Sequence, residues 1–150
     1  MFRTIALAAT AVALTFGAAH AADFEVKALN FDKGQMMVLE PSLLRIAPGD
    51  TVHFIVQDKG HNFESVPGML PDGATPIAGK INENLTVTFD KPGVYGIRCH
   101  PHYPMGMVGL VVVGTPTNEA TAKAAPQIGK AAKVFAGLFE KLDSQTTAAK

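Results

Sequence analysis

A short loop rich in metal-binding side chains constrains this chain more than any other part of its sequence. Residues 99–107 read Cys-His-Pro-His-Tyr-Pro-Met-Gly-Met and contain the only cysteine, two of the five histidines and two of the six methionines. Each proline ring fixes a backbone φ angle and stiffens the loop. Because apolar, strand-like runs flank it on both sides, the sequence predicts a rigid loop between two strands, with donor atoms at Cys99, His102 and Met107.

The donor types in this loop favour copper. Thiolate, imidazole and thioether groups are soft or borderline ligands, and a blue-copper site combines two imidazoles, one thiolate and a weak axial ligand. The loop supplies one of these imidazoles, so the second has to come from elsewhere in the chain. The best candidate is His61, in the segment Asp-Lys-Gly-His-Asn-Phe that directly follows an apolar run. Together, His61, Cys99, His102 and Met107 predict one type 1 copper ion per chain.

At these residues the sequence resembles the cupredoxin family, and within it the pseudoazurins. The resemblance extends from about Ala22 to the C-terminus and implies the same four copper ligands, together with two C-terminal helices. Apart from the loop, it is carried by five short motifs: Glu40-Pro41, Ala47-Pro48-Gly49-Asp50-Thr51-Val52, Asp58-Lys59-Gly60-His61-Asn62, Lys80-Ile81-Asn82-Glu83-Asn84 and Pro92-Gly93-Val94-Tyr95.

Two pairs of neighbouring residues compete for places in the predicted metal site. A strand residue directly after Cys99 points to the opposite face, and the family places its ligand three residues after the cysteine, so His102 is preferred to His100. Alignment with the family likewise places the axial sulfur at Met107 and leaves Met105 in the surrounding apolar surface. His100 stands where the family commonly carries threonine, and the sequence leaves its role open.

Three further residues are expected beside the ligands. By resemblance, Asn62 holds the two copper-bearing loops together. Met37 aligns with a family position near the exposed ligand histidine, although a role as an ordinary core methionine explains it equally well. Pro101 adds stiffness next to the ligands.

The N-terminal segment predicts export. Arg3 gives a short positive region, an apolar run ends at Phe16, and Ala19-His20-Ala21 has the small-x-small pattern of a cleavage site. The apolar run is shorter than the roughly 20 residues that a membrane span needs. We therefore predict a signal peptide over residues 1–21 and a periplasmic mature protein that forms a single domain over residues 22–150.

The charge balance and the cysteine count narrow the function further. Without Arg3 the chain holds 12 basic and 13 acidic residues, and this near-neutral total argues against nucleic-acid binding. A lone cysteine in an exported protein cannot form an internal disulfide. The neighbours of Cys99 favour a metal ligand over a buried core thiol.

Alternating apolar and polar residues predict a mainly β fold. In residues 51–57, for example, Val52, Phe54 and Val56 should face the core and His53 the opposite side. Many short strands separated by turn residues, taken with the resemblance, indicate a Greek-key antiparallel β-sandwich. Residues 66–80 are rich in proline and glycine and predict an irregular connection. The expected strands lie at 24–29, 36–40, 43–46, 51–57, 84–90, 93–98 and 108–113.

The C-terminal part of the chain changes to a helical period. Residues from about 115 to 145 predict two helices separated by Pro126, the first starting at Thr115-Pro116-Thr117. The second helix carries an apolar stripe that we expect to pack on the sandwich. The stripe consists of Ile128, Ala131, Ala132, Phe135, Leu138, Phe139 and Leu142.

The predicted function is one-electron transfer between other proteins. A metal site whose positions are all filled by protein groups leaves no place for a substrate, which argues for a carrier and against an enzyme. By resemblance, electrons leave through the ring edge of His102, within an apolar patch of Pro101, Pro104, Met105 and Ile77. The family surrounds this patch with cations, for which the candidates here are Lys33, Lys59, Lys80 and Arg98. Two positions of that ring instead carry the apolar residues Phe31 and Ala78, which would weaken the electrostatic attraction of an acidic partner.

The resemblance also implies a partner, and two other functions compete. The implied partner is a copper nitrite reductase of denitrification, with c-type cytochromes and other periplasmic reductases as alternatives, for a monomeric carrier that does not insert into membranes. A copper enzyme would need a second site, but only His53 and His100 remain as further histidines of the mature chain. A copper chaperone or store would favour an open, Met-rich or Cys-x-x-Cys site, which the sequence does not clearly contain.

Overall fold

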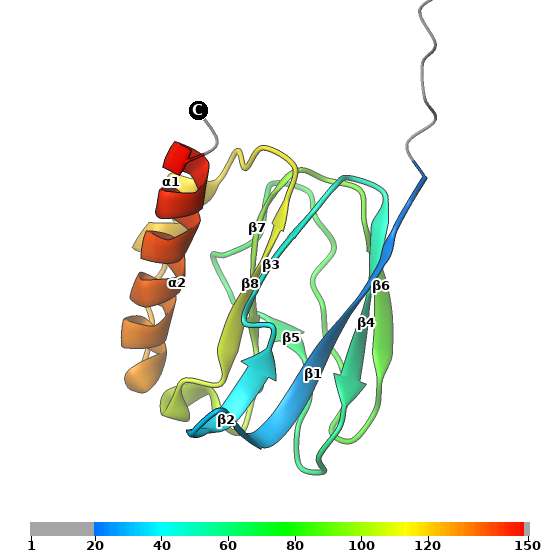
Figure 1. Cartoon of the computed structure of the whole chain (residues 1–150), viewed down its shortest axis with the longest axis vertical. Coiled ribbons are helices and arrows are strands. Elements are labelled where there is room, and N and C mark those ends of the chain that lie inside the picture. Colours follow the sequence, from blue (N-terminus) through cyan, green and yellow to red (C-terminus); the bar gives the residue numbers. More distant parts are fainter. Residues whose placement is uncertain (1–19, 149–150) are drawn as a thin grey trace, which may run out of the picture.

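Two four-stranded sheets form the body of the protein (Figure 1). The computed structural model describes residues 20–148, so nearly all of the predicted signal segment, residues 1–19, lies outside the described part. One sheet has the strand order β2-β1-β4-β6 and the other the order β3-β8-β7-β5. The strands are β1 Asp23–Asp32, β2 Gln35–Glu40, β3 Leu43–Ile46, β4 Asp50–Val56, β5 Glu64–Ser65, β6 Leu85–Phe89, β7 Gly93–Arg98 and β8 Val108–Val113.

The predicted β-sandwich is confirmed, but its strand pairing is mixed. Four pairs are antiparallel, namely β1–β2, β4–β6, β5–β7 and β7–β8, whereas β1–β4 and β3–β8 run parallel. β1 and β4 run in the same direction because the chain visits β3 in the other sheet between them. Alternation in a sequence shows which residues face the core, but it says nothing about the direction of the neighbouring strand. The two-residue strand β5 was also missed, since it is too short to show alternation.

The inner faces of the two sheets enclose an aromatic and aliphatic core. The ring of Phe54 lies 5.0 Å from that of Phe63, and the Phe89 ring meets Tyr95 edge-on at 4.9 Å. Burying each of these large apolar side chains contributes about 1.5–3 kcal/mol to folding. His53 lies on the outer face, as predicted, where its ring nitrogens lie 3.0 Å from Thr86 Oγ1 and 3.0 Å from Asp23 Oδ1.

A second apolar layer attaches the C-terminal helices to the sandwich. The long helix α2, Lys130–Ala148, lies along the outside of the sheet that contains β8 (Figure 1). β8 is therefore buried on both faces, with Val111 and Val113 in the sandwich core and Leu110 and Val112 beneath the helices. This double burial explains why β8 is a continuous apolar run. Within the described residues, no helix has the length and apolar content needed to cross a membrane.

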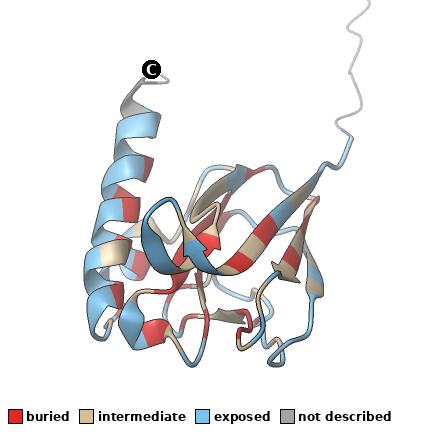
Figure 2. Cartoon of the chain, turned by 60° about the horizontal axis from the view of Figure 1, so that its bottom comes forward, coloured by how far each residue is buried: buried red, intermediate tan, exposed pale blue. Residues whose placement is uncertain are grey.

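The apolar stripe of α2 faces the sheet over most of its length. Five of its seven predicted members are buried, namely Ala131, Phe135, Leu138, Phe139 and Leu142. In Figure 2 the buried bands of the helix lie on the side that faces the sheets. The other two are exposed. Ile128 precedes the helix and is 52% exposed, and Ala132 lies on its outer side.

The first C-terminal helix begins later than predicted. α1 spans only Glu119–Ala124, so the expected start at Thr115-Pro116-Thr117 is wrong. The reason is Asn118, whose side-chain oxygen accepts the N–H of Val94 at 2.7 Å while its NH2 group donates to the Val94 carbonyl at 2.9 Å. These bonds fasten the chain to β7, and a helix can form only after that anchor. The predicted break near Pro126 is confirmed, because α2 starts at Lys130.

Candidate metal centre

Two loops bring the predicted donors together at one end of the sandwich. His61 lies in the connection between β4 and β5, whereas Cys99 follows directly after β7. The loop from Cys99 to β8 contains a short 3-10 helix, η1, Tyr103–Met105. Two backbone hydrogen bonds close this loop, one from Cys99 N–H to Met107 O at 3.0 Å and one from Met107 N–H to His102 O at 3.2 Å. The cysteine and the methionine are therefore held opposite each other at the base of the loop.

Three of the donor atoms lie close enough together to share one metal ion. His61 Nδ1 and His102 Nδ1 are 3.0 Å apart, and Cys99 Sγ lies 3.5 Å from each of them. Bonds from zinc, a comparable transition-metal ion, to imidazole nitrogen and thiolate sulfur are about 2.0–2.3 Å long. Donors at the observed separations can therefore bind a single ion placed between them. Met107 is fully buried in the same apolar cluster as Cys99, which positions it as the fourth donor.

The hydrogen bond on the far side of the His61 ring shows that this cluster suits a cation. His61 Nε2 lies 2.9 Å from Asn30 Oδ1, which can only accept, so Nε2 carries the ring proton. The Nδ1 atom of His61 is then left with a bare lone pair that faces His102 and Cys99. A buried acceptor such as this needs a hydrogen-bond donor or a cation beside it, and a metal ion bound between His61, Cys99 and His102 would supply the cation.

Burial also adjusts the proton affinities of the donors. Burial, and then the proximity of His102, lower the pKa of His61, so its imidazole stays neutral and able to bind metal. Burial raises the pKa of the Cys99 thiol, although the backbone amides of Asn62 and His102 stabilise the thiolate and work in the opposite direction. The thiol therefore keeps its proton until a cation arrives, because metal coordination removes the proton from a thiol.

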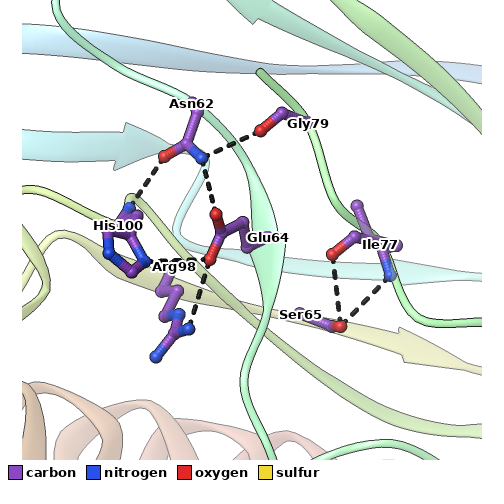
Figure 3. A network of polar contacts seen from close by, with 7 residues as sticks. All are labelled: Asn62, Glu64, Ser65, Ile77, Gly79, Arg98 and His100. Carbon is purple, nitrogen blue, oxygen red and sulfur yellow. Dashed lines mark hydrogen bonds and ion pairs between the residues drawn. The ribbon is translucent and has the colours of Figure 1, made fainter. Parts of the chain in front are cut away.

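Asn62 joins the two loops. Its buried side chain accepts the N–H of His100 through Oδ1 at 2.8 Å. Its NH2 group donates to the Gly79 carbonyl and to Glu64 Oε1, both at 2.9 Å, as Figure 3 shows. The loop that carries His61 is thus tied to the residue directly after Cys99.

The structure separates the two pairs of competing residues. The side chain of His100 is 66% exposed and its Nδ1 lies 3.2 Å from Glu64 Oε2, while His102 faces His61 and Cys99. Met105 is 45% exposed, whereas Met107 is fully buried beside the cysteine.

The other predicted residues surround this cluster. Met37 has a left-handed backbone, with φ at 55°, and its half-buried side chain packs against the apolar cluster that contains Cys99 and Met107. Pro101 and Pro104 are exposed on the loop beside the partly exposed His102. Ile77, expected in the surface patch, is only 7% exposed and belongs to the core.

The four candidate cations of the partner surface differ in their surroundings. Lys33 is paired with Glu40 at 2.8 Å, and Lys80 lies 3.9 Å from Glu83. The Arg98 side chain is 20% exposed and is bound to Glu64 at 3.2 Å, so its charge is largely directed into the protein. Lys59 is exposed, as are Phe31 and Ala78, the apolar residues of this ring.

Two residues that support the site were missed from the sequence. Asn30 lies in β1, 31 positions before His61, and nothing in the local sequence connects them. Glu64 left a weak signal, since it follows Asn62 by two positions and residues at this spacing share one side of an extended segment.

Comparison with known proteins agrees with this geometry. A sequence profile described as copper binding proteins of the plastocyanin/azurin family matches residues 25–114. The chain belongs to this family. It is similar to a pseudoazurin from Methylorubrum extorquens, with 47% identity over 87% of this chain and 89% of that protein, and to one from Paracoccus pantotrophus, with 47% identity over 83% and 88%.

Solved structures of this family show the same fold. A pseudoazurin from Sinorhizobium has a TM-score of 0.80 and 43% identity, covering 82% of this chain and 98% of that chain. The predicted resemblance to cupredoxins, and within them to pseudoazurins, is thereby confirmed. This member of the plastocyanin/azurin family positions His61, Cys99, His102 and Met107 to form a type 1 copper site, the donor set of a cupredoxin electron carrier.

Proposed function

We propose that this protein carries single electrons between periplasmic redox partners by means of one type 1 copper ion held by His61, Cys99, His102 and Met107. The observation that carries the proposal is the convergence of two imidazole nitrogens and the only cysteine within 3.5 Å of one another, beside a buried thioether. When bound, copper supplies the exchange between Cu(II) and Cu(I). With the donor positions filled by protein, no coordination site is left for a substrate, and the function is not enzymatic.

The protein holds its donors rigidly, which suits electron transfer. Two prolines and two backbone hydrogen bonds restrict the loop from Cys99 to Met107, and Asn62 ties this loop to His61. Donors that cannot rearrange change position little when the charge on the site changes, which keeps the reorganisation energy low. Burial of Cys99 and Met107 also argues against a copper store, because stored copper has to leave easily.

Electrons pass through the exposed edge of His102. His61 is fully buried, while His102 is partly exposed and lies in the same loop as the exposed Pro101, Pro104 and Met105. An apolar rim of this kind excludes water from a contact without binding a partner tightly. Small contacts with few charges are typical of brief encounters between redox proteins.

Electrostatic steering by this surface is weak. Lys33, Lys80 and Arg98 each have a carboxylate partner that offsets their charge, at 2.8, 3.9 and 3.2 Å. The exposed Lys59 is therefore the candidate cation whose charge is least offset by a neighbouring carboxylate, and such a charge affects the association rate more than the affinity. The partner we propose is a copper nitrite reductase, with c-type cytochromes and other periplasmic reductases as alternatives, and the carrier acts as an exported monomer starting at Ala22.

Spectroscopy of the copper-loaded mature chain tests the site. One equivalent of Cu(II) should produce an intense thiolate-to-copper absorption band and the electron paramagnetic resonance signal of a type 1 site. Cys99→Ser should abolish the band and Met107→Ala should alter it, while His53→Ala, which removes a histidine outside the site, should leave both signals unchanged. A pale spectrum that Cys99→Ser does not affect would refute the carrier function.

Kinetics test the partner. Stopped-flow mixing of the reduced protein with a copper nitrite reductase should show rapid oxidation, which slows when Met105→Lys introduces charge into the apolar rim. Equal oxidation rates for the wild type and Met105→Lys would show that the reductase contacts another part of the surface. If a c-type cytochrome oxidises the protein and the reductase does not, the cytochrome is the partner.

A further inference from the structure

Glu64 occupies an unusual place beside the proposed copper site. It lies in the short strand β5 and is paired across the sheet with Arg98, the last residue of β7. Its side chain is 25% exposed and its carboxylate accepts from three side chains, as Figure 3 shows. Two of these donors bind Oε2, namely Arg98 Nη2 and His100 Nδ1, each at 3.2 Å.

These two donors flank the cysteine in sequence. Arg98 comes directly before Cys99 and His100 directly after it. One carboxylate oxygen thus restrains the chain on both sides of the thiolate, and the other holds Asn62. This gives the side chain of His100 a role away from the metal, as a donor to Glu64.

The second carboxylate oxygen determines how the Asn62 amide is oriented. An ionised carboxylate can only accept hydrogen bonds, as can the Gly79 carbonyl, so the NH2 group of Asn62 must face these two acceptors. The Asn62 oxygen is then directed at the N–H of His100. Reversing the amide would set oxygen against oxygen at Glu64 and at Gly79.

The three donors also keep Glu64 ionised. Burial would raise the pKa of this carboxyl group, but hydrogen bonds from Asn62, His100 and Arg98 together lower the pKa below its ordinary value. The same negative charge lies close to the cysteine, because Glu64 binds the side chains of both neighbours of Cys99. A negative charge beside the copper ion would favour the more positive Cu(II) over Cu(I).

We propose that Glu64 is a positioning residue of the copper site, which fixes the cysteine loop through Arg98, His100 and Asn62, and that its charge lowers the reduction potential. The proposal rests on the proposed function for its second part only. The positioning part concerns contacts between protein groups, so it can be tested without metal.

Two variants separate position from charge. Glu64→Gln keeps an acceptor for Asn62 but removes the charge, whereas Glu64→Ala removes both. Glu25→Gln is a matched control, since Glu25 is an exposed glutamate on β1 whose ion-pair partner is Lys27 at 3.4 Å. The measurements are hydrogen exchange of the His100 amide in the metal-free chain, followed by the reduction potential and paramagnetic resonance spectrum of the copper-loaded chain.

In the metal-free chain, Glu64→Ala should speed exchange of the His100 amide at least tenfold relative to amides of β4, and Glu25→Gln should not. In the copper-loaded chain, Glu64→Gln should raise the potential while the thiolate band persists, and Glu64→Ala should also change the copper hyperfine splitting. Unchanged His100 exchange in Glu64→Ala would overturn the positioning role, and a potential that moves no more than in Glu25→Gln would overturn the charge effect. A wild-type chain without a thiolate-to-copper band would refute the proposed function and the charge effect, while the exchange data still decide the positioning role.

Discussion

The hydrogen bond between Asn30 and His61 offers a direct way to test how the site is prepared for metal. Asn30 Oδ1 accepts the Nε2 proton of His61 at 2.9 Å and so leaves Nδ1 free to bind copper. Asn30→Ala removes this acceptor, while the backbone N–H of residue 30 keeps its own bond to Asp58 at 2.7 Å. The substitution should therefore weaken copper binding without loosening β1.

The expected loss of copper affinity in Asn30→Ala depends on how deeply His61 and Asn30 are buried. An unsatisfied buried N–H costs about 1–3 kcal/mol, and losing a hydrogen-bond partner of a ligand histidine lowers metal affinity about 10- to 100-fold. His61 is fully buried, but Asn30 is exposed, so water can enter when the side chain is shortened. We therefore expect the lower end of the range, about tenfold weaker copper binding, or about 1.4 kcal/mol.

Competition with a chelator of known affinity would measure the loss of copper affinity in Asn30→Ala. The control is Asn30→Asp, which keeps a hydrogen-bond acceptor for His61 Nε2. Nitrogen NMR of the metal-free protein should show the His61 proton on Nε2 in the wild type and a mixture of tautomers in Asn30→Ala. If Asn30→Ala binds copper within twofold of the wild type and keeps a single tautomer, the reasoning is wrong.

Three further predictions concern stability. Burial and the nearby His102 lower the pKa of His61 in the folded, metal-free chain below its ordinary value of about 6.5. Below about pH 6.5 the unfolded chain therefore binds more protons than the folded chain, and the free energy of unfolding should drop by up to about 1.4 kcal/mol for each pH unit. Urea titrations at several pH values measure this drop, and a free energy of unfolding that does not change with pH would contradict the prediction. Phe135→Ala should cost about 3–5 kcal/mol in the same assay because this side chain anchors α2, against less than about 0.5 for the exposed Lys133→Ala. Asp50→Ala should lower the free energy of unfolding by about 1–3 kcal/mol, because the buried carboxylate accepts hydrogen bonds from the N–H groups of Ala22 at 2.8 Å and Ala47 at 2.7 Å. An unchanged urea midpoint would show that water takes over the hydrogen bonds of this carboxylate.

Local sequence predicted most of the fold because periodicity reports burial. The alternation around Phe54 and the helical stripe around Phe135 both correctly indicate the buried side. Local patterns fail where a distant contact decides the outcome. The Asn118 side chain pairs with Val94 and delays α1, although the residues before it carry suitable helix-start chemistry.

The donor types can be read from the sequence alone, because a thiol, imidazoles and thioethers all belong to one short, proline-stiffened segment, residues 99–107. The choice of His102 over His100 and of Met107 over Met105 came from the resemblance to the family, and the structure shows His102 and Met107 beside Cys99. Bringing His61 to Cys99 requires the sandwich to fold, because only the packing of two sheets brings loops 38 residues apart within hydrogen-bonding distance.

The residues that tune the site were decided by tertiary structure. Asn30 reaches His61 because β1 runs alongside β4, and Glu64 reaches both neighbours of Cys99 because β5 pairs with the end of β7. Register between strands is set by long-range packing of side chains from the whole core, and no short stretch of sequence contains that information.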